Sequence, residues 1–392
     1  MRSTQSNSAT HPISFGFRVK AKNRMFFASM GFDLCDKSGF PKPEFLSIYK
    51  SLMDGGCGFG FIGNASVDEE SHYNERGLKL ASEAHMEALL PVFNTANDKR
   101  FPLGIQLQHY GPQGIPSNAT TAIMSPSGIS SPLLQKRFPS AQSLPMSDTQ
   151  IQKVIEKFAY SAHLAQRAGA SLIQLQASNG YLISSFLSPR TNRRKDRWGG
   201  SPLRRAEMLL AIIRRAKKAT DGRATITVRL GIDDGFGDQG QQVELLGEVV
   251  SELEDAGVSA IECSVGVNET YKLFFEDKDA ALKLLRHGCR YLKTFAKIPI
   301  GFTGSVANVE MANSIIESGD SDFVGFGRAV LADNNLVKKE LNGLEHKVNR
   351  CRWDAQCFRD KREPKANRVY CCVNPDYLRP NYLQQLYKEN PK

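Results

Sequence analysis

The stretch from Ser147 to Ala177 reads SDTQIQKVIEKFAYSAHLAQRAGASLIQLQA and holds the pattern that decides the fold. From Thr149 to Ala168, apolar residues recur at i, i+3 and i+4 spacing behind a cap candidate at Ser147/Asp148, which predicts an amphipathic helix. The last part, Ser171–Ala177, is a short apolar run with the length of a strand. The stretch therefore predicts one helix followed by one buried strand.

This unit recurs along the chain. Strand-like runs are predicted at Arg24–Met30, Gly58–Asn64, Leu103–His109, Ser171–Ala177, Thr225–Leu230, Val258–Ser264, Ile298–Thr303 and Asp322–Phe326. Helical spacing lies between most of them, as at Pro202–Ala219, Val243–Ala256 and Val306–Ser318. Strands that alternate with helices pair in parallel, because each helix returns the chain to the same edge of the sheet. Eight such units predict an α/β fold, the closed (β/α)8 or TIM barrel.

An open, doubly wound sheet is the alternative architecture for this alternation. It is disfavoured because no G-x-G-x-x-G motif follows the first strand. We expect a flexible leader over residues 1–13, a single catalytic barrel over residues 14–342, and a cysteine-containing extension over residues 343–392 that packs on the barrel. The Pro-, Ser- and Gly-rich stretch Tyr110–Ser147 is too long for an ordinary loop and is expected to cross the barrel mouth.

Composition and charge narrow the class of protein. The 392 residues carry a net charge of +10, but the densest basic cluster, Arg190–Arg197, lacks the interleaved aromatic residues of a single-strand binder, so nucleic-acid binding is not expected. No segment approaches the roughly 18 apolar residues of a membrane span, so membrane insertion is not expected either. The eight cysteines form no small disulfide framework, which favours a reducing, cytoplasmic location. Self-association into a homo-oligomer is left open.

In a (β/α)8 barrel, ligand groups come from the carboxyl ends of the strands. Those ends supply Ser29, Met30, Gly31, Asn64, Gln106, His109, Gln176, Asn179, Arg229, Thr303, Gly304, Gly327 and Arg328. This set is rich in amides and arginine and has no carboxylate pair or metal motif, so it favours a large polar cofactor over hydrolysis or a metal. Two glycine-containing turns, Thr303-Gly304-Ser305 and Gly327-Arg328, precede helices and suit a phosphate group.

One long block carries a family resemblance. Residues Asn179–Ala206 read NGYLISSFLSPRTNRRKDRWGGSPLRRA. Shorter matches stand in the same order at Lys22–Met25 (KNRM), Gln106–His109 (QLQH), Val228–Leu230 (VRL) and Asp322–Arg328 (DFVGFGR). Together they cover about residues 14–340 and resemble the Old Yellow Enzyme family of FMN-dependent NAD(P)H:flavin oxidoreductases. The long block is specific, whereas the short matches would mean little without it.

The resemblance implies a role for each residue at the strand ends. It implies that Ala28, Ser29, Met30, Gly31 and Asn64 run along the flavin through backbone contacts, that Gln106 bonds its pyrimidine edge, that Arg229 faces N1 and O2, and that Gly304, Ser305, Gly327 and Arg328 hold the phosphate. A cation at the position of Arg229 favours the negatively charged reduced flavin. The alternative for Arg229 is a surface or barrel-bottom salt bridge, since a buried charge normally needs a partner.

The resemblance also implies the reaction. NAD(P)H reduces FMN, the flavin N5 hydride then reduces an activated C=C bond of an enone or nitroalkene, and Tyr181 gives the proton. Gln176 and Asn179 stand where the family has two donors that hold the substrate's oxygen. Read alone, Tyr181 is also compatible with simple packing, and the two amides with inward-facing barrel residues. The alternative functions are a flavin-dependent isomerase or demethylase on the same barrel, or a catalytically silent flavin-binding protein.

Two departures from the family pattern bear on substrate and potential. Gln176 replaces the family's histidine and cannot become cationic. Gly31 replaces a threonine or cysteine whose side chain touches the flavin, so this contact is expected to be missing. In the tail, Cys351, Cys357, Cys371 and Cys372 miss the spacing of an iron–sulfur motif and lack a paired zinc knuckle, so reduced thiols and no metal are expected.

Overall fold

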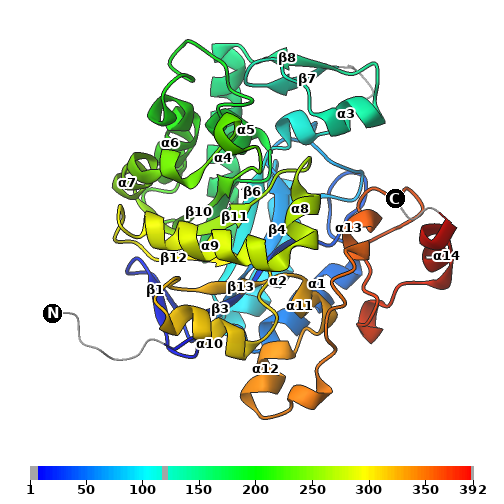
Figure 1. Cartoon of the computed structure of the whole chain (residues 1–392). Helices are drawn as coiled ribbons and strands as arrows, with labels where there is room; N and C mark the ends of the chain where they lie inside the picture. Colours follow the sequence, from blue (N-terminus) through cyan, green and yellow to red (C-terminus); the bar gives the residue numbers. More distant parts are fainter. Residues whose placement is uncertain (1–7, 117–121, 390–392) are drawn as a thin grey trace.

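A closed cylinder of parallel strands forms the centre of the molecule (Figure 1). The computed structural model describes residues 8–116 and 122–389. The barrel strands are β3 (Met25–Gly31), β4 (Phe59–Ser66), β6 (Leu103–Gln108), β9 (Leu172–Ala177), β10 (Ile226–Asp233), β11 (Val258–Val265), β12 (Ile300–Thr303) and β13 (Val324–Phe326). They pair in the order β3-β13-β12-β11-β10-β9-β6-β4, and β4 pairs back with β3. The predicted (β/α)8 barrel is confirmed, and the open sheet is wrong.

Helices follow the barrel strands along the chain and cover the outside of the barrel. They are α1 (Pro43–Asp54), α2 (Glu83–Asp98), α4 (Asp148–Ala168), α6 (Pro202–Ala219), α7 (Gly247–Asp255), α9 (Lys278–Leu292), α10 (Val309–Glu317) and α12 (Leu336–Leu341). Shorter elements are β5 (Leu78–Lys79), α5 (Leu182–Leu187), α8 (Tyr271–Glu276) and α11 (Arg328–Ala332). Because helices cover the strands outside and side chains fill the interior, most strands read as nearly continuous apolar runs. None of the described helices combines the length and apolar character needed to cross a membrane.

A small hairpin closes the amino-terminal end of the barrel. Strands β1 (Ile13–Phe15) and β2 (Val19–Ala21) pair antiparallel. The Phe15 ring meets that of Phe59 edge-on at 4.8 Å, inside a cluster of buried aromatic residues. Of the predicted leader, residues 1–7 lie outside the described part; Ala9 is fully buried and its amide donates to the Asn313 side chain at 3.0 Å.

The long stretch after β6 folds into a unit of its own. It contains β7 (Ala122–Ser125), α3 (Pro132–Arg137) and β8 (Gln142–Pro145), and the two strands pair in parallel. Residues 117–121 of this stretch lie outside the described part.

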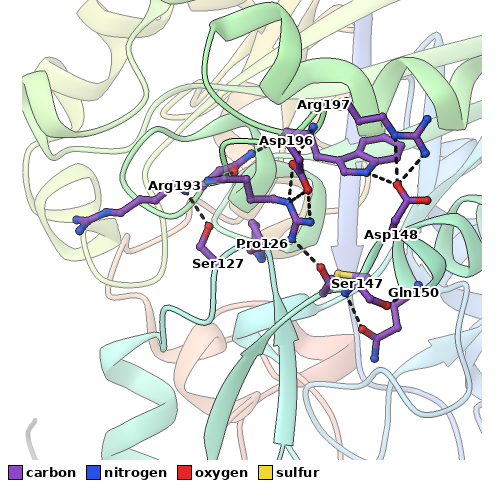
Figure 2. A network of polar contacts seen from close by, with 12 residues as sticks. Pro126, Ser127, Ser147, Asp148, Gln150, Arg193, Asp196 and Arg197 are labelled. Atoms are coloured by element: carbon purple, nitrogen blue, oxygen red, sulfur yellow. Dashed lines mark hydrogen bonds and ion pairs between the residues drawn. The ribbon is translucent and has the colours of Figure 1, made fainter.

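The basic cluster after α5 fastens this unit to the barrel (Figure 2). The guanidinium of Arg194 donates through Nη1 to the carbonyl oxygens of Pro126, at 2.8 Å, and Met146, at 2.7 Å. Its Nε and Nη2 bond the carboxylate of Asp196. Arg194, within the block that carries the family resemblance, therefore stabilises the scaffold, and its donors bond the chain itself.

The C-terminal extension, orange to red in Figure 1, is held by a buried ion pair. It contains α13 (Gln356–Asp360) and α14 (Asn381–Glu389). Arg379 donates to both oxygens of Asp360, at 2.5 and 2.9 Å, and neither side chain is exposed. Arg76, in the loop after β4, donates to the Asp360 carbonyl at 3.2 Å, which binds the extension to the carboxyl end of the barrel.

Candidate functional site

A cavity of about 340 Å³ lies at the carboxyl ends of the barrel strands. It falls in the size range of small-ligand sites. The fourteen residues that the sequence predicts for the site all line it: Ala28, Ser29, Met30, Gly31, Asn64, Gln106, Gln176, Asn179, Tyr181, Arg229, Gly304, Ser305, Gly327 and Arg328. A second, larger hollow of about 640 Å³ lies at the amino ends of β12 and β13, where barrel enzymes do not place their chemistry.

A directed chain of polar side chains crosses the floor of this cavity. Ser29 on β3 donates to Gln106 on β6 at 3.0 Å, Gln106 donates to Gln174 on β9 at 2.7 Å, and Gln174 donates to Glu262 on β11 at 2.8 Å. Glu262 is 1% exposed and lies 3.2 Å from Arg229 on β10. Each amide orientation is thus fixed by the carboxylate at the end of the chain, because a carboxylate only accepts.

Arg229 is only partly satisfied by this chain. Its Nη1 faces Glu262, its Nη2 donates to Ser264 at 3.3 Å, and its buried Nε has no hydrogen-bond partner among the described residues. A buried donor without a partner costs free energy unless a ligand satisfies it. The guanidinium therefore suits the anionic or carbonyl edge of a bound molecule.

Arg328 provides a second buried cation, directly after β13. Its guanidinium lies 4.2 Å from the ring centre of Phe275 and 4.6 Å from that of Trp353. Burial lowers the pKa of Arg328, and its buried Nη1 has no hydrogen-bond partner in the described part of the chain. A guanidinium that contacts two aromatic rings and keeps a donor without a partner fits a phosphate group.

Tyr181 lies at the start of α5, after the left-handed residues Asn179 and Gly180. Burial raises the pKa of the Tyr181 phenol, and the nearby cations of Arg362 and Arg229 offset the shift only in part. The ring of Tyr110 meets that of Tyr181 edge-on at 5.5 Å and holds it in place. The phenol is therefore protonated at neutral pH and can act as a proton donor.

Gln176 and Asn179 lie side by side, with the Gln176 Nε2 atom 3.5 Å from the Asn179 Oδ1 atom. The Asn179 amide donates to the carbonyl of Gly266 at 3.1 Å and to Ser264 at 3.4 Å, so its donors are already used. The Gln176 side-chain oxygen accepts from the Ser178 hydroxyl at 2.7 Å. The Gln176 amino group therefore points away from Ser178. Of the two, Gln176 has the more available donor.

One wall of the cavity comes from the C-terminal extension, which the sequence reasoning left out of the site. It consists of Trp353, Cys357, Phe358, Lys361 and Val369. Burial raises the pKa of Cys357 to about 12, so its thiol is neutral. No cluster of three metal-binding side chains occurs among residues 8–116 and 122–389, and all eight cysteines are free. The sequence reasoning also missed Gln174 and Glu262, although a glutamate inside an apolar strand is itself an unusual signal.

The fold and the site together define a barrel enzyme that binds a large, polar, anionic cofactor. Four buried polar atoms on residues lining the cavity have no partner in the described chain: Gln108 Nε2, Arg229 Nε, Thr303 Oγ1 and Arg328 Nη1. Buried polar atoms in native proteins usually bond a protein group, a water or a ligand, and these four lie together where a ligand could reach them.

Comparison with known proteins names the family. Residues 10–347 match the NADH:flavin oxidoreductase / NADH oxidase family, and the chain belongs to it. This match confirms the Old Yellow Enzyme resemblance, and with it FMN as the cofactor of the family and NADH or NADPH as its reductant.

Individual relatives are similar over most of this chain. It is 29% identical over 359 residues to the NADH oxidase of Thermoanaerobacter brockii, covering 90% of this chain but only 54% of that protein. It is 27% identical to the NADPH dehydrogenase of Bacillus subtilis, covering 82% of this chain and 91% of the relative. The solved structure of the old yellow enzyme homologue from Zymomonas mobilis shares the fold, with a TM-score of 0.72, 19% identity, and coverage of 88% and 94%.

Proposed function

We propose that this chain uses FMN and NADH or NADPH to reduce an activated carbon–carbon double bond, of the enone or nitroalkene type. The observation that carries the proposal is the convergence of two buried arginines, a buried phenol and an amide donor on one cavity, with four donor or hydroxyl atoms left without partners. Since these atoms fit a flavin with a phosphate tail, the chemistry at the site is a two-electron transfer that bound FMN supplies.

Different residues of the cavity would bind different parts of the cofactor. Arg328, with Gly304, Ser305 and Gly327 beside it, would hold the phosphate. The backbone of Ala28–Gly31 on β3 and of Asn64 on β4 would lie along the ring. Gln106 would bond the ring's polar edge, since its orientation is fixed by Ser29 and Gln174. Arg229 would face the part of the ring where negative charge collects on reduction.

The substrate would lie between the cofactor and the residues after β9. Gln176 would donate from its amino group to the carbonyl or nitro oxygen of the substrate, which draws electrons from the double bond. Tyr181 would deliver a proton to the substrate carbon as the other carbon is reduced. Neighbouring apolar side chains such as Val267 and Phe358 would exclude water from this step.

The test begins with the purified protein. It is expected to be yellow, to release FMN on heating, and to oxidise NADH or NADPH faster when cyclohexenone or maleimide is added. A colourless protein that takes up no added FMN would contradict the proposal. Reduction of the bound flavin without turnover on either alkene would instead favour the isomerase or demethylase alternative, which the neutral Gln176 amide suggests.

Arg229→Ala is expected to weaken FMN binding by about 10- to 100-fold, because it removes charge-assisted hydrogen bonds to the cofactor. It is also expected to slow flavin reduction by NAD(P)H. Fluorescence titration of the apoprotein with FMN measures the first effect, and stopped-flow absorbance the second. Since the variant leaves Glu262 buried without its cation, the double variant Arg229→Ala with Glu262→Gln is the control for stability. Wild-type affinity in both would refute the role of Arg229.

A further inference from the structure

The space that a side chain at position 31 would fill is occupied by Lys361 of the C-terminal extension. A Cβ atom at Gly31 would lie 2.6 Å from the Nζ atom of Lys361 and 3.0 Å from the Oδ1 atom of Asn64. Gly31 does not have a positive φ, so its backbone conformation does not require glycine. A larger side chain at position 31 would collide with the Lys361 ammonium group where it now lies.

Lys361 is held firmly at this position. Its Nζ donates to the carbonyl oxygen of Gly31 at 2.7 Å and to the Oδ1 atom of Asp33 at 2.9 Å. Its own carbonyl accepts from Asn74 at 3.1 Å. An ammonium group has three donors, and with two of them used the third is available to a molecule in the cavity that Lys361 lines.

The local charge around Lys361 remains positive. Asp33 is the carboxylate that faces it, and the other oxygen of Asp33 lies 3.6 Å from the guanidinium of Arg76. One buried anion is therefore shared between two cations. Asp33 therefore neutralises Lys361 only in part, and Lys361 is the member of this group that lines the cavity.

This charge lies across the barrel from Arg229. Along the closed sheet, β3 and β10 are separated by three strands in either direction, β13-β12-β11 on one side and β4-β6-β9 on the other. A planar ring across the mouth would thus have a cation at each of two opposite sides.

We propose that Lys361 is a cofactor-contacting residue that donates a hydrogen bond to the flavin ring at the end of β3, and that it raises the flavin's reduction potential by stabilising the negative charge of the reduced ring. This inference rests on the proposed function, since it requires FMN in the cavity. The extension would thus supply the hydrogen bond to the ring that a side chain at position 31 of β3 could otherwise supply. Gly31 and Lys361 then act as one unit.

The test compares FMN-loaded variants by equilibrium reduction against a reference dye. Lys361→Gln is expected to shift the flavin–dye equilibrium about tenfold toward oxidised flavin, which is about 30 mV for a two-electron couple. Lys361→Arg keeps the charge and is expected to retain most of the wild-type potential. Lys365→Gln, an exposed lysine of the same extension, is the matched control and is expected to have the wild-type value.

Gly31→Ala tests the same contact without removing the lysine. Its methyl group would displace the flexible end of Lys361, so the potential should fall in the same direction. The double variant Gly31→Ala with Lys361→Gln should not add to the single effects, because both act on one contact. The melting temperature of each apoprotein shows whether the variant folds.

The outcomes distinguish failure of the Lys361 contact from failure of the proposed function. A folded, FMN-loaded Lys361→Gln protein with the wild-type potential would overturn the role of Lys361 and leave the proposed function standing. A wild-type protein that binds no FMN would overturn both. Weakened FMN binding by folded Lys361→Gln, with Lys361→Arg unaffected, would support the contact.

Discussion

Tyr181→Phe is expected to slow reoxidation of the reduced flavin by an alkene about 10²- to 10⁴-fold, the usual contribution of a positioned proton donor. Reduction of the flavin by NAD(P)H should keep its wild-type rate, because that half-reaction does not use the phenol. Stopped-flow absorbance of the flavin measures the two half-reactions separately. Since burial raises the pKa of Tyr181 above its ordinary value of about 10, this group should not impose a loss of rate up to pH about 9.

The control for Tyr181→Phe is Tyr49→Phe. Tyr49 is also a buried phenol, and its oxygen accepts from the Gly63 amide at 3.1 Å, but it does not line the cavity. Its loss should lower stability slightly and leave both half-reactions unchanged. A Tyr181→Phe protein that is slow only in flavin reduction would overturn the role of the phenol as proton donor.

Arg379→Met is expected to lower the free energy of unfolding of the extension by about 3–5 kcal/mol, because Asp360 would remain buried without its cation. Among the described residues, the Asp360 carboxylate would keep the Tyr370 amide and the Tyr387 hydroxyl as donors. Limited proteolysis of the extension and denaturant unfolding measure the loss. Since α13 carries Cys357 and Phe358 to the cavity, FMN binding should weaken as well.

The pH dependence of Arg379→Met follows from the same burial. Burial raises the pKa of Asp360, and in the wild type Arg379 opposes this shift. Without Arg379 the folded protein binds a proton that the unfolded chain releases, so stability falls as pH rises. The deficit of Arg379→Met should therefore be larger at pH about 8 than at pH about 5. The apolar double variant Asp360→Leu with Arg379→Met should recover much of the loss; if it is as unstable as the single variant, the buried pair is not the cause.

The barrel could be predicted because its signals are local. Each strand is an apolar run and each helix repeats every three to four residues, so pairing follows from the alternation. The boundaries that differ have physical reasons. β12 begins at Ile300 because Pro299 has no amide hydrogen, and α10 begins at Val309 because Asn308 caps it by accepting from the Met311 amide. The predicted helix Val243–Ala256 is divided at Leu246 into a 3-10 turn and α7.

The cavity could be predicted only where strand ends supply it. Parallel strands bring their carboxyl ends together, so residues far apart in sequence, such as Gly31 and Arg229, are expected at one mouth. No such rule places the extension. Lys361 bonds Gly31, which lies 330 positions earlier in the chain. Neither the composition of the extension nor the spacing of its residues indicates that contact. The Gln174–Glu262 bond was missed because a polar residue facing the barrel interior looks the same in sequence as one facing a helix.

The reach of the extension also sets an order of assembly. Contacts such as that of Lys361 with Asp33, 328 positions earlier, close a very long loop and form late compared with the neighbouring strand pairs of the barrel. During synthesis, the cylinder can therefore complete its folding while the wall that carries Lys361 is still being made. A nascent chain would complete the flavin site only after residues 343–369 have been synthesised, when the stable scaffold already exists.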